Sequence, residues 1–390
     1  MSAATLHDPA DKVAGGVRAS TLAERVFRIR ESGIIVVLAV FVLVTTLVQP
    51  RFLSLANIQF ILVDTTVFAL LALGETMVVV TRNVDLSIGS VLGLSAYLSA
   101  NLFTVSPGIP IPVVFLAGLG IGLACGLVNG ILVAGGRVPS LVVTLATLYI
   151  IRGIDILIVG GKEVVAASLP SAFLQIPKST VFGIPDIAIV VAVVIGVGAY
   201  YMRTFRSGRD LYAIGSNPEA ARLAGIPDIA VAVAVVIAIG AYYLRTYRSG
   251  RDLYAIGSNP DAARLAGIPI GRRVLVAFVC SGAIAGVAGV LWAAQYGTVD
   301  STAGTGYELQ VISAVVVGGV AIFGGSGSAV GAALGALLLN TISSALYVLG
   351  ISPFWDQAIW GFLLLLAITI DRLISVRLTA ALRVRGARHE

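Results

Sequence analysis

Apolar runs long enough to cross a bilayer recur along almost the whole chain, and this feature constrains the fold most. A helix of roughly 20 apolar residues spans the hydrocarbon core of a membrane. A transmembrane β-barrel would instead show alternating segments of about 10 residues, and the sequence has none of these. We therefore predict an all-α, polytopic transmembrane helical bundle. Eleven runs are candidate spans: residues 33–48, 60–80, 88–103, 110–133, 139–159, 185–202, 227–244, 273–296, 309–323, 330–349 and 355–370.

The composition agrees with this class. Hydrophobic residues make up 58% of the 390 residues and charged residues 12%, and the mean hydropathy is +0.99. Soluble domains carry about 25% charged residues, so the composition excludes that class. Cys125 and Cys280 fall within apolar runs, where we expect them to pack as small hydrophobic side chains. His7 and His389 lie near the chain ends. Because no histidine stands within a span, we predict no metal site.

Both terminal segments are polar and basic. Five cations precede the first apolar run, and five arginines follow Asp371. Cytoplasmic segments beside membrane spans are rich in Lys and Arg, so we expect both ends in the cytoplasm. By the same argument, the net charge of +6 indicates topology rather than nucleic-acid binding. The N-terminal segment does not read as a removable signal peptide. The predicted organisation is a basic tail at 1–32, a transmembrane domain at 33–371 and a basic tail at 372–390.

A tandem duplication lies within the transmembrane domain. Residues 186–227 match residues 228–269 at about 35 of 42 positions. Each copy joins an apolar stretch to a charged segment, and we call these charged segments the first platform (206–227) and the second platform (248–269). Ionised groups and loop backbone are costly in hydrocarbon, so a platform must face water. Without one copy ten spans remain, an even number that suits two cytoplasmic ends. The extra stretch either crosses, lies tilted or re-enters, and the sequence leaves all three open.

The second platform carries the signals of a short capped helix. Asn259 stands where an N-cap would, Pro260 at the first helical position and Gly267 just past the end. Asp261 near the start and Arg264 near the end both suit the helix dipole. A capped helix outside the membrane fits a socket on another protein, and docking is our interpretation. The alternative is a plain loop between two spans.

Glycines recur at intervals of four residues in several runs. This spacing places them on one helix face, where they let two helices approach closely. We expect static packing contacts from them, and a sliding gate is the alternative. The glycines are Gly118, Gly122, Gly126 and Gly130, then Gly282 and Gly286, and finally Gly327, Gly331 and Gly335.

The platform resembles the coupling loop of the ribose-type permeases of bacterial ATP-binding-cassette (ABC) importers. Four further segments are similar to that family, in the same order along the chain. They are residues 74–90 with an Asp-Leu-Ser motif, 138–147 followed by Arg152-Gly153, 307–327 with a glycine-rich end, and 354–361. The similarity covers residues 33–375. The patterns at 81–87 and 304–308 are also similar to permeases for rhamnose and for the furanosyl signal autoinducer-2.

The resemblance implies a multi-pass permease subunit of the bacterial cytoplasmic membrane that moves a monosaccharide or sugar-like solute inward. Its expected partners are a second permease copy, identical or different, a separate ATPase subunit and an extracytoplasmic sugar-binding protein. The chain has no G-x-x-x-x-G-K-[ST] phosphate loop, so we expect ATP and Mg²⁺ to bind the partner. We expect no cofactor and no enzymatic activity on this chain.

The resemblance also assigns candidate residues. Those expected to meet the ATPase in the second platform are Arg251, Asp252, Tyr254, Asn259, Asp261, Arg264 and Gly267. Their counterparts in the first platform are Arg209, Asp210, Asn217, Arg222 and Gly225. The candidates for the translocation path are Glu75, Asn83, Asp85, Ser87 and Glu308. For two of these residues a structural role is the alternative to a role in the path. Asp85 would then only cap a helix, with Arg82 as its ion-pair partner. Glu75 would face a water-filled vestibule or stay protonated.

Rival functions remain. A permease of the related branched-chain amino-acid importers would use a similar scaffold for a different solute. A proton-coupled secondary transporter would use Glu75 or Asp85 as its proton site and would work without ATP. A membrane enzyme has no catalytic constellation in the sequence to support it.

Overall fold

The computed structural model describes residues 32–178, 180–181, 184–185 and 248–369. The first platform, both apolar stretches of the duplication beyond residue 185, and both terminal tails lie outside the described residues. The predictions that concern them, including Arg209, Asp210, Asn217, Arg222 and Gly225, therefore stay predictions.

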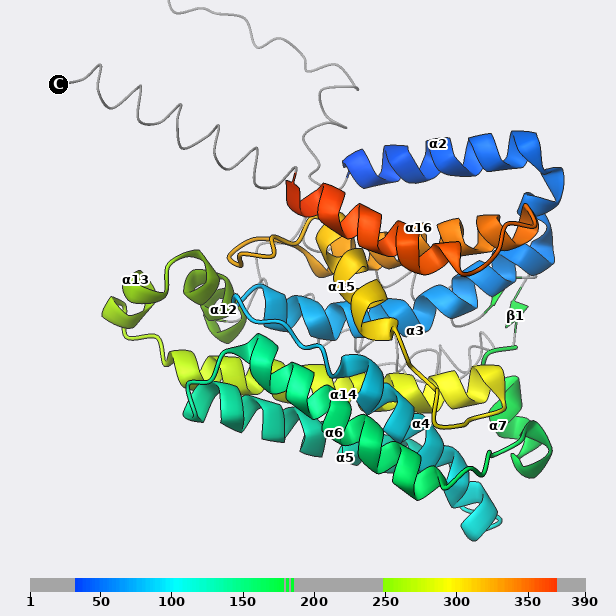
Figure 1. Cartoon of the computed structure of the whole chain (residues 1–390), viewed down its shortest axis with the longest axis horizontal. Coiled ribbons are helices and arrows are strands. Elements are labelled where there is room, and N and C mark those ends of the chain that lie inside the picture. Colours follow the sequence, from blue (N-terminus) through cyan, green and yellow to red (C-terminus); the bar gives the residue numbers. More distant parts are fainter. Residues whose placement is uncertain (1–31, 179, 182–183, 186–247, 370–390) are drawn as a thin grey trace, which may run out of the picture.

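The described residues form a helical bundle, which confirms the all-α prediction (Figure 1). Its first helices are α2 (Ser32–Val48), α3 (Leu55–Val79), α4 (Ile88–Val105), α5 (Ile111–Gly130, continued by a π-helical turn at Ile131–Gly135), α6 (Ser140–Val159) and α7 (Ser171–Gln175). Next come α12 (Arg248–Ser258), α13 (Pro260–Leu265), α14 (Ile270–Tyr296), α15 (Tyr307–Val317), α16 (Ala329–Val348) and a last helix at Trp355–Thr369. The strands β1 (Thr180–Val181) and β2 (Ile184–Pro185) form a two-residue antiparallel pair.

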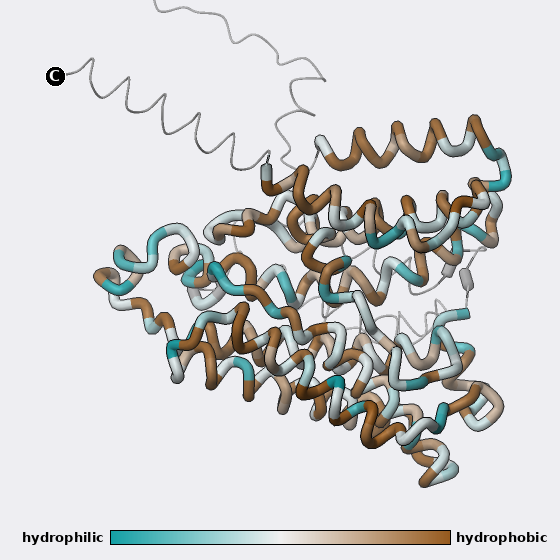
Figure 2. The backbone as a smooth tube through the Cα atoms, in the orientation of Figure 1, coloured by the Kyte–Doolittle hydropathy of each residue, from teal (hydrophilic) through white to brown (hydrophobic). Residues whose placement is uncertain are grey.

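Six of the described helices are long and apolar enough to cross a membrane: α3, α4, α5 with its π turn, α6, α14 and α16. Apolar residues predominate along the long helices, and polar residues are more frequent in the connections and around α12 and α13 (Figure 2). Leu157 of α6 is 81% exposed and Leu47 of α2 is 75% exposed. Large apolar side chains are exposed on this scale where lipid or another subunit covers them.

The glycine face of α5 packs against α14, as the spacing predicted. A side-chain carbon added at Gly122 would lie against the carbonyl oxygen of Gly282 and 2.9 Å from the Cα of Gly286. Gly118 faces Gly286 in the same way, and Gly126 faces Phe278. The two backbones therefore touch, which is the close approach that small residues allow between membrane helices. One glycine was misplaced, because Gly327 belongs to the loop before α16 and not to that helix.

The predicted span at 309–323 is wrong in length. Helix α15 has 11 residues and ends at Val317, and residues 318–328 form a loop. At 1.5 Å per residue, α15 reaches about 16 Å, roughly half the hydrocarbon thickness. Gln310 of α15 donates to Asn340, in the middle of α16, at 3.0 Å. The start of α15 thus lies inside the bundle. The segment is a half-helix followed by a loop, and the mostly apolar sequence does not show where the helix ends.

The connections gather at two ends of the bundle. At one end, which we call the platform end, α12 and α13 lie beside the end of α3 and the loop before α16 (Figure 1). There the Gly325 backbone N–H donates to the Val80 carbonyl at 2.9 Å. At the opposite end, Val164 and Val299 form an isolated β-bridge beside α7.

Candidate functional site

The second platform folds into two helices at an angle to the bundle. Asn259 is the N-cap of α13, and its side-chain oxygen accepts from the backbone N–H groups of Asp261 and Ala262, both at 3.1 Å. Pro260 occupies the first turn, and Gly267 follows the helix with φ +73°, a value that favours glycine. The capped helix that the sequence predicted is therefore present.

Helix α12, by contrast, was missed by the sequence analysis. Its residues include Gly250, Gly257 and two serines, which have low helix propensity. Packing overrides that propensity, because Leu253 and Ile256 are 0% and 2% exposed on the inner face of the helix. Asp252 also anchors α12 to α14: its Oδ2 accepts from Arg273, 2.9 Å from Nε and 2.8 Å from Nη2.

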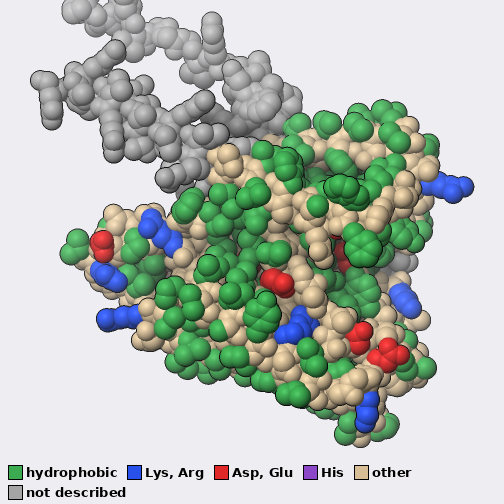
Figure 3. Space-filling model, in the orientation of Figure 1, with side chains coloured by type: hydrophobic (Ala, Val, Ile, Leu, Met, Phe, Trp, Pro, Cys, Tyr) green, Lys and Arg blue, Asp and Glu red, His purple; other side chains and the backbone are tan. Residues whose placement is uncertain are grey.

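The outer face of α13 projects away from the bundle. Leu265 is 91% exposed, and only Ala263 of this helix is buried. Asp261 and Arg264 form an ion pair of 3.6 Å with both side chains largely in solvent. In the space-filling view, cations and a carboxylate cluster at this projecting end (Figure 3). An apolar tip flanked by charges has the composition of a docking surface, with an anchor at the centre and a polar rim.

A cavity of about 640 Å³ lies beneath the platform. It is bounded by the loop after α3, the turn between α5 and α6, α13 and the start of α14. Arg82, Arg137 and Arg264 line it, and no carboxylate is among the described residues that do so. Asn83, a candidate for the translocation path, faces this cavity, and its amide donates to the carbonyl and the hydroxyl of Thr81.

Three other path candidates come together where α4 begins. The backbone N–H of Asp85 donates to Glu75 Oε1 at 3.1 Å. Asp85 Oδ1 accepts from the backbone N–H of Ser87 at 3.0 Å and from its hydroxyl at 2.6 Å, and Asn129 of α5 donates to that hydroxyl at 2.8 Å. All four residues are at most 1% exposed. The cluster therefore ties α3, the loop and α5 together behind the start of α4.

The ion pair between Asp85 and Arg82, one of the structural readings left open by the sequence, does not form. Asp85 bonds to Ser87, two residues ahead, rather than to the first turn of α4. Arg82 turns the other way and donates to the carbonyl groups of Gly257 and Ser258 in α12. The reason is geometric: the loop bends at Arg82, which has φ +64°, so the two side chains leave it on different sides.

The fifth path candidate, Glu308, lies beside the start of α4. A side-chain carbon at Gly89, in the first turn of α4, would come 2.6 Å from Glu308 Oε2. Glu308 is half-buried and stands in the first turn of α15. Because Gly89 and Glu308 each lie in the first turn of their helix, the N-termini of α4 and α15 meet inside the bundle (Figure 1). Broken helices whose ends face one another within the membrane are a recurrent feature of transporter binding sites.

Arg152 and Asp155 complete this junction, and the sequence analysis did not count them as path residues. Arg152 Nη1 donates to the carbonyls of Ser301 and Ala303, at 3.1 and 2.7 Å, in the loop that leads to α15. It lies 3.8 Å from Asp155 Oδ2, and neither oxygen of this buried carboxylate accepts a hydrogen bond from a described residue. Their presence three residues apart within the apolar run 139–159 was a usable signal, because ionisable residues inside spans are functional candidates.

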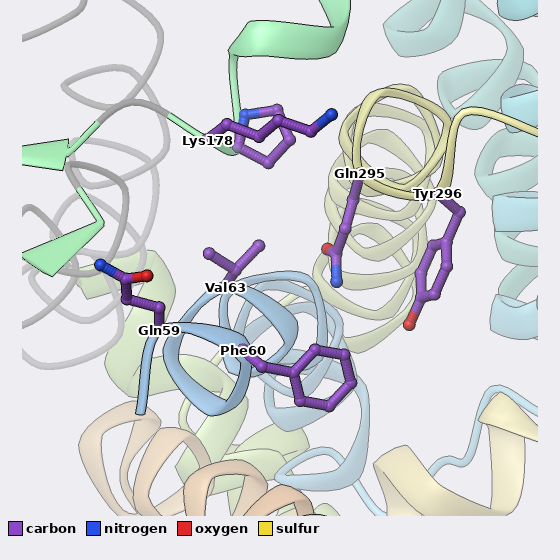
Figure 4. Close-up of a pocket in the computed structure, with 7 residues that line it drawn as sticks. Gln59, Phe60, Val63, Lys178, Gln295 and Tyr296 are labelled. Atoms are coloured by element: carbon purple, nitrogen blue, oxygen red, sulfur yellow. The ribbon is translucent and has the colours of Figure 1, made fainter. Parts of the chain in front are cut away.

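A second cavity, of about 330 Å³, opens at the opposite end of the bundle (Figure 4). Gln59, Phe60 and Val63 of α3 form one wall, Gln295 and Tyr296 of α14 the other, and Lys178 reaches over them. Next to it Asp64 accepts from the Tyr296 hydroxyl at 2.8 Å and from the Gln295 amide at 3.3 Å. Amide, ammonium and aromatic groups together can form hydrogen bonds to a small polar solute and pack against it. None of the five path candidates lines this cavity.

Within the described part of the chain, no cluster of three or more His, Cys, Asp or Glu side chains is placed to hold a metal ion. Cys125 and Cys280 are both free thiols there, each partly buried among apolar neighbours.

Comparison with known proteins gives consistent matches. The model of the family "Branched-chain amino acid transport system / permease component" matches residues 57–242 and again residues 227–368. The second match begins where the second copy of the duplication begins, as two overlapping copies of one segment require. No solved structure matches the chain.

Similar relatives cover nearly the whole chain. The autoinducer 2 import system permease protein LsrC of Enterobacter sp. (strain 638) is 33% identical over 348 residues, 89% of this chain and 88% of the relative. The LsrC proteins of Escherichia coli O157:H7 and Salmonella typhi are each 31% identical over 356 residues, 90% of this chain and 89% and 88% of those relatives.

Proposed function

This chain belongs to the family of branched-chain amino acid transport system permease components, in its ribose-type ABC importer branch, and we propose that it imports a sugar-like solute under the power of a separate ATPase. The LsrC relatives are named as permeases for autoinducer 2 import, which supports a small, hydroxylated solute of that kind. The predicted membership of the ribose-type family is thereby confirmed. Membership of a permease family also supports the proposal that this chain is a transporter subunit and that ATP is hydrolysed by its partner.

The observation that carries the proposal is the pairing of two features in one bundle. A capped helix with an exposed apolar tip projects at one end, and two helix N-termini meet inside the bundle. The first suits a motor subunit outside the membrane, and the second suits a solute on its way through. The start of α2 and the end of the last described helix lie toward the platform end, which supports a cytoplasmic platform (Figure 1).

In the proposed cycle, ATP closes two ATPase subunits beneath a pair of permeases, and α13 moves with the subunit to which it is docked. Movement of α13 reaches the bundle through α12 and α14, because Asp252 joins them through Arg273. An extracytoplasmic sugar-binding protein would deliver the solute at the opposite end, where the cavity beside Tyr296 lies. ATP and Mg²⁺ would bind the partner.

Among the path candidates, Glu308 is best placed to meet the solute. Its carboxylate is half-buried at the meeting point of α4 and α15 and lies close enough to Arg152 to interact with it electrostatically. Glu75, Asp85 and Ser87 are almost completely buried, and their hydrogen bonds are to one another and to Asn129. We assign them to holding the loop before α4, and Glu308 to the path itself.

Replacing Glu308 by glutamine should therefore lower solute uptake by about tenfold or more, because a hydrogen bond to a charged acceptor contributes about 1.5–3 kcal/mol. Membrane accumulation and ATPase binding should not change, since the amide has the same shape. Uptake of labelled solute into cells measures the effect. Glu163→Gln is the matched control, an exposed carboxylate at the opposite end that should transport as the wild type does. Equal uptake by the two variants would remove Glu308 from the path.

Reconstitution tests the whole proposal. The chain would be placed in proteoliposomes with a partner ATPase and a sugar-binding protein of an import system of this family. Uptake of autoinducer-2, ribose, rhamnose and leucine would then be followed. We expect uptake of one of the sugar-like solutes that requires ATP on the platform side. Uptake of leucine alone would favour the amino-acid importer. Uptake by the chain alone, driven by a proton gradient, would favour the secondary transporter and refute the proposal.

A further inference from the structure

Arg82 links two segments that lie far apart in the sequence. Its Nε donates to the carbonyl of Gly257, and its Nη2 donates to the carbonyl of Ser258 at 2.8 Å. These carbonyls belong to the last turn of α12, where no further helical N–H groups are available to them. A cation at that position also suits the negative end of the helix dipole. Arg82 thus caps the platform helix from the loop that follows α3.

The backbone at Arg82 is in an uncommon conformation. Its φ of +64° lies in the left-handed region, which a residue with a side chain enters at a cost of about 1–2 kcal/mol. A glycine would adopt this conformation without that cost. The arginine is therefore best explained by its side chain, whose two hydrogen bonds to α12 offset the backbone strain.

Close packing holds the same joint from the other side. A side-chain carbon at Gly257 would collide with the Val80 carbonyl, and one at Gly325 would come 2.8 Å from the Cα of Ser258. The Gly325 N–H donates to the Val80 carbonyl at 2.9 Å, and the Tyr254 hydroxyl donates to the Gly327 carbonyl at 3.2 Å. At Gly257 and Gly325 the backbones of α12, the end of α3 and the glycine-rich loop before α16 thus come into direct contact.

The loop beyond Arg82 leads directly to the buried cluster. Val84 accepts from Thr144 at 3.1 Å and donates to the Ser140 hydroxyl at 3.2 Å, and the Asp85 N–H binds Glu75. Only two residues, Asn83 and Val84, lie between Arg82 and Asp85. A displacement of Arg82 therefore cannot be absorbed by a long flexible connection. Beyond Ser87, helix α4 begins and meets Glu308.

We propose that Arg82 is the positioning residue that passes movement of the platform to the loop before α4. The inference rests on the proposed function, because it assumes a motor that moves the platform. Movement of the platform would then reach the bundle by two routes. One is the Asp252–Arg273 ion pair, and the other runs from Arg82 through the loop to the junction of α4 and α15. Arg82 touches neither solute nor nucleotide in this scheme and acts only through α12.

The test compares variants of the full complex in proteoliposomes. Arg82→Ala should bind the ATPase as the wild type does and hydrolyse ATP at a similar rate, but transport per ATP should fall by about tenfold, within the usual range of coupling between sites. Arg82→Gly should show the same loss although its backbone is relaxed. Arg82→Lys should be intermediate, because an ammonium cannot match the paired geometry of a guanidinium. Arg137→Ala, which changes another arginine of the same cavity, should transport normally.

Two outcomes would overturn the inference. Wild-type transport per ATP in Arg82→Ala and Arg82→Gly would show that the joint carries no movement. Loss of ATPase binding in both variants would assign Arg82 to the folding of the platform instead. Neither outcome contradicts the proposed function if the wild-type complex shows ATP-driven uptake. If the wild-type complex shows no such uptake, the proposed function itself is refuted.

Discussion

Replacing Gly122 by leucine should prevent the bundle from assembling, whereas the same replacement at Gly120 should be tolerated. At Gly122 a side-chain carbon would lie against the Gly282 carbonyl and 2.9 Å from the Gly286 Cα, so only backbone could move aside. At Gly120 nothing lies within 4 Å, and the residue is exposed on the outer face of α5. Adding a few carbons to a packed core lowers stability by about 1–3 kcal/mol. The loss at Gly122 should be larger, because leucine there would separate α5 from α14 along much of their contact.

Membrane accumulation and the midpoint of thermal unfolding in detergent measure this difference. We expect Gly122→Leu to be degraded or to unfold far below the wild type, and Gly120→Leu to unfold within a few degrees of it. Gly122→Ala should fall between the two, since one carbon already meets the backbone. Equal midpoints for Gly122→Leu and Gly120→Leu would show that α5 and α14 do not pack in this way.

The helices of this bundle could be predicted because a single physical rule governs them. An apolar run as long as the bilayer is thick forms a helix that spans it. Eight of the nine candidate spans among the described residues accordingly agree with helices to within a few residues. The exception is 309–323, where an apolar run contains both a half-helix and a glycine-rich loop. Hydropathy does not distinguish them, because both the half-helix and the first residues of the loop are mostly apolar or glycine.

The polar network could be predicted only in part. The sequence singled out Glu75, Asp85 and Ser87 as path candidates, because all three lie in the segment 74–90 that resembles the family. It could not foresee Arg82 turning to α12, since that contact joins residues 175 positions apart. Arg152 and Asp155 were recognisable as ionisable residues within a span, yet the carbonyl groups that Arg152 binds lie in a loop that only the fold brings into the bundle.

Replacing Leu265 by aspartate should abolish ATP-driven uptake by detaching the proposed ATPase. The side chain is 91% exposed at the tip of α13, so it contributes almost nothing to the stability of the chain itself. An apolar residue so exposed on a capped helix, with an ion pair beside it, is the best candidate for an anchor in a partner's pocket. Losing such an anchor typically costs 2 kcal/mol or more, so affinity for the ATPase should fall by about 30-fold or more.

Co-purification of the ATPase with the chain, and uptake in cells, test this prediction together. Leu265→Met is the matched control, because it keeps an apolar tip of similar size and should retain both binding and uptake. The two variants should accumulate equally in the membrane, which separates a lost partner from a lost fold. If Leu265→Asp bound the ATPase as tightly as Leu265→Met, the second platform would not be the docking site. The first platform would then become the candidate, and Arg222 would be the residue to reverse there.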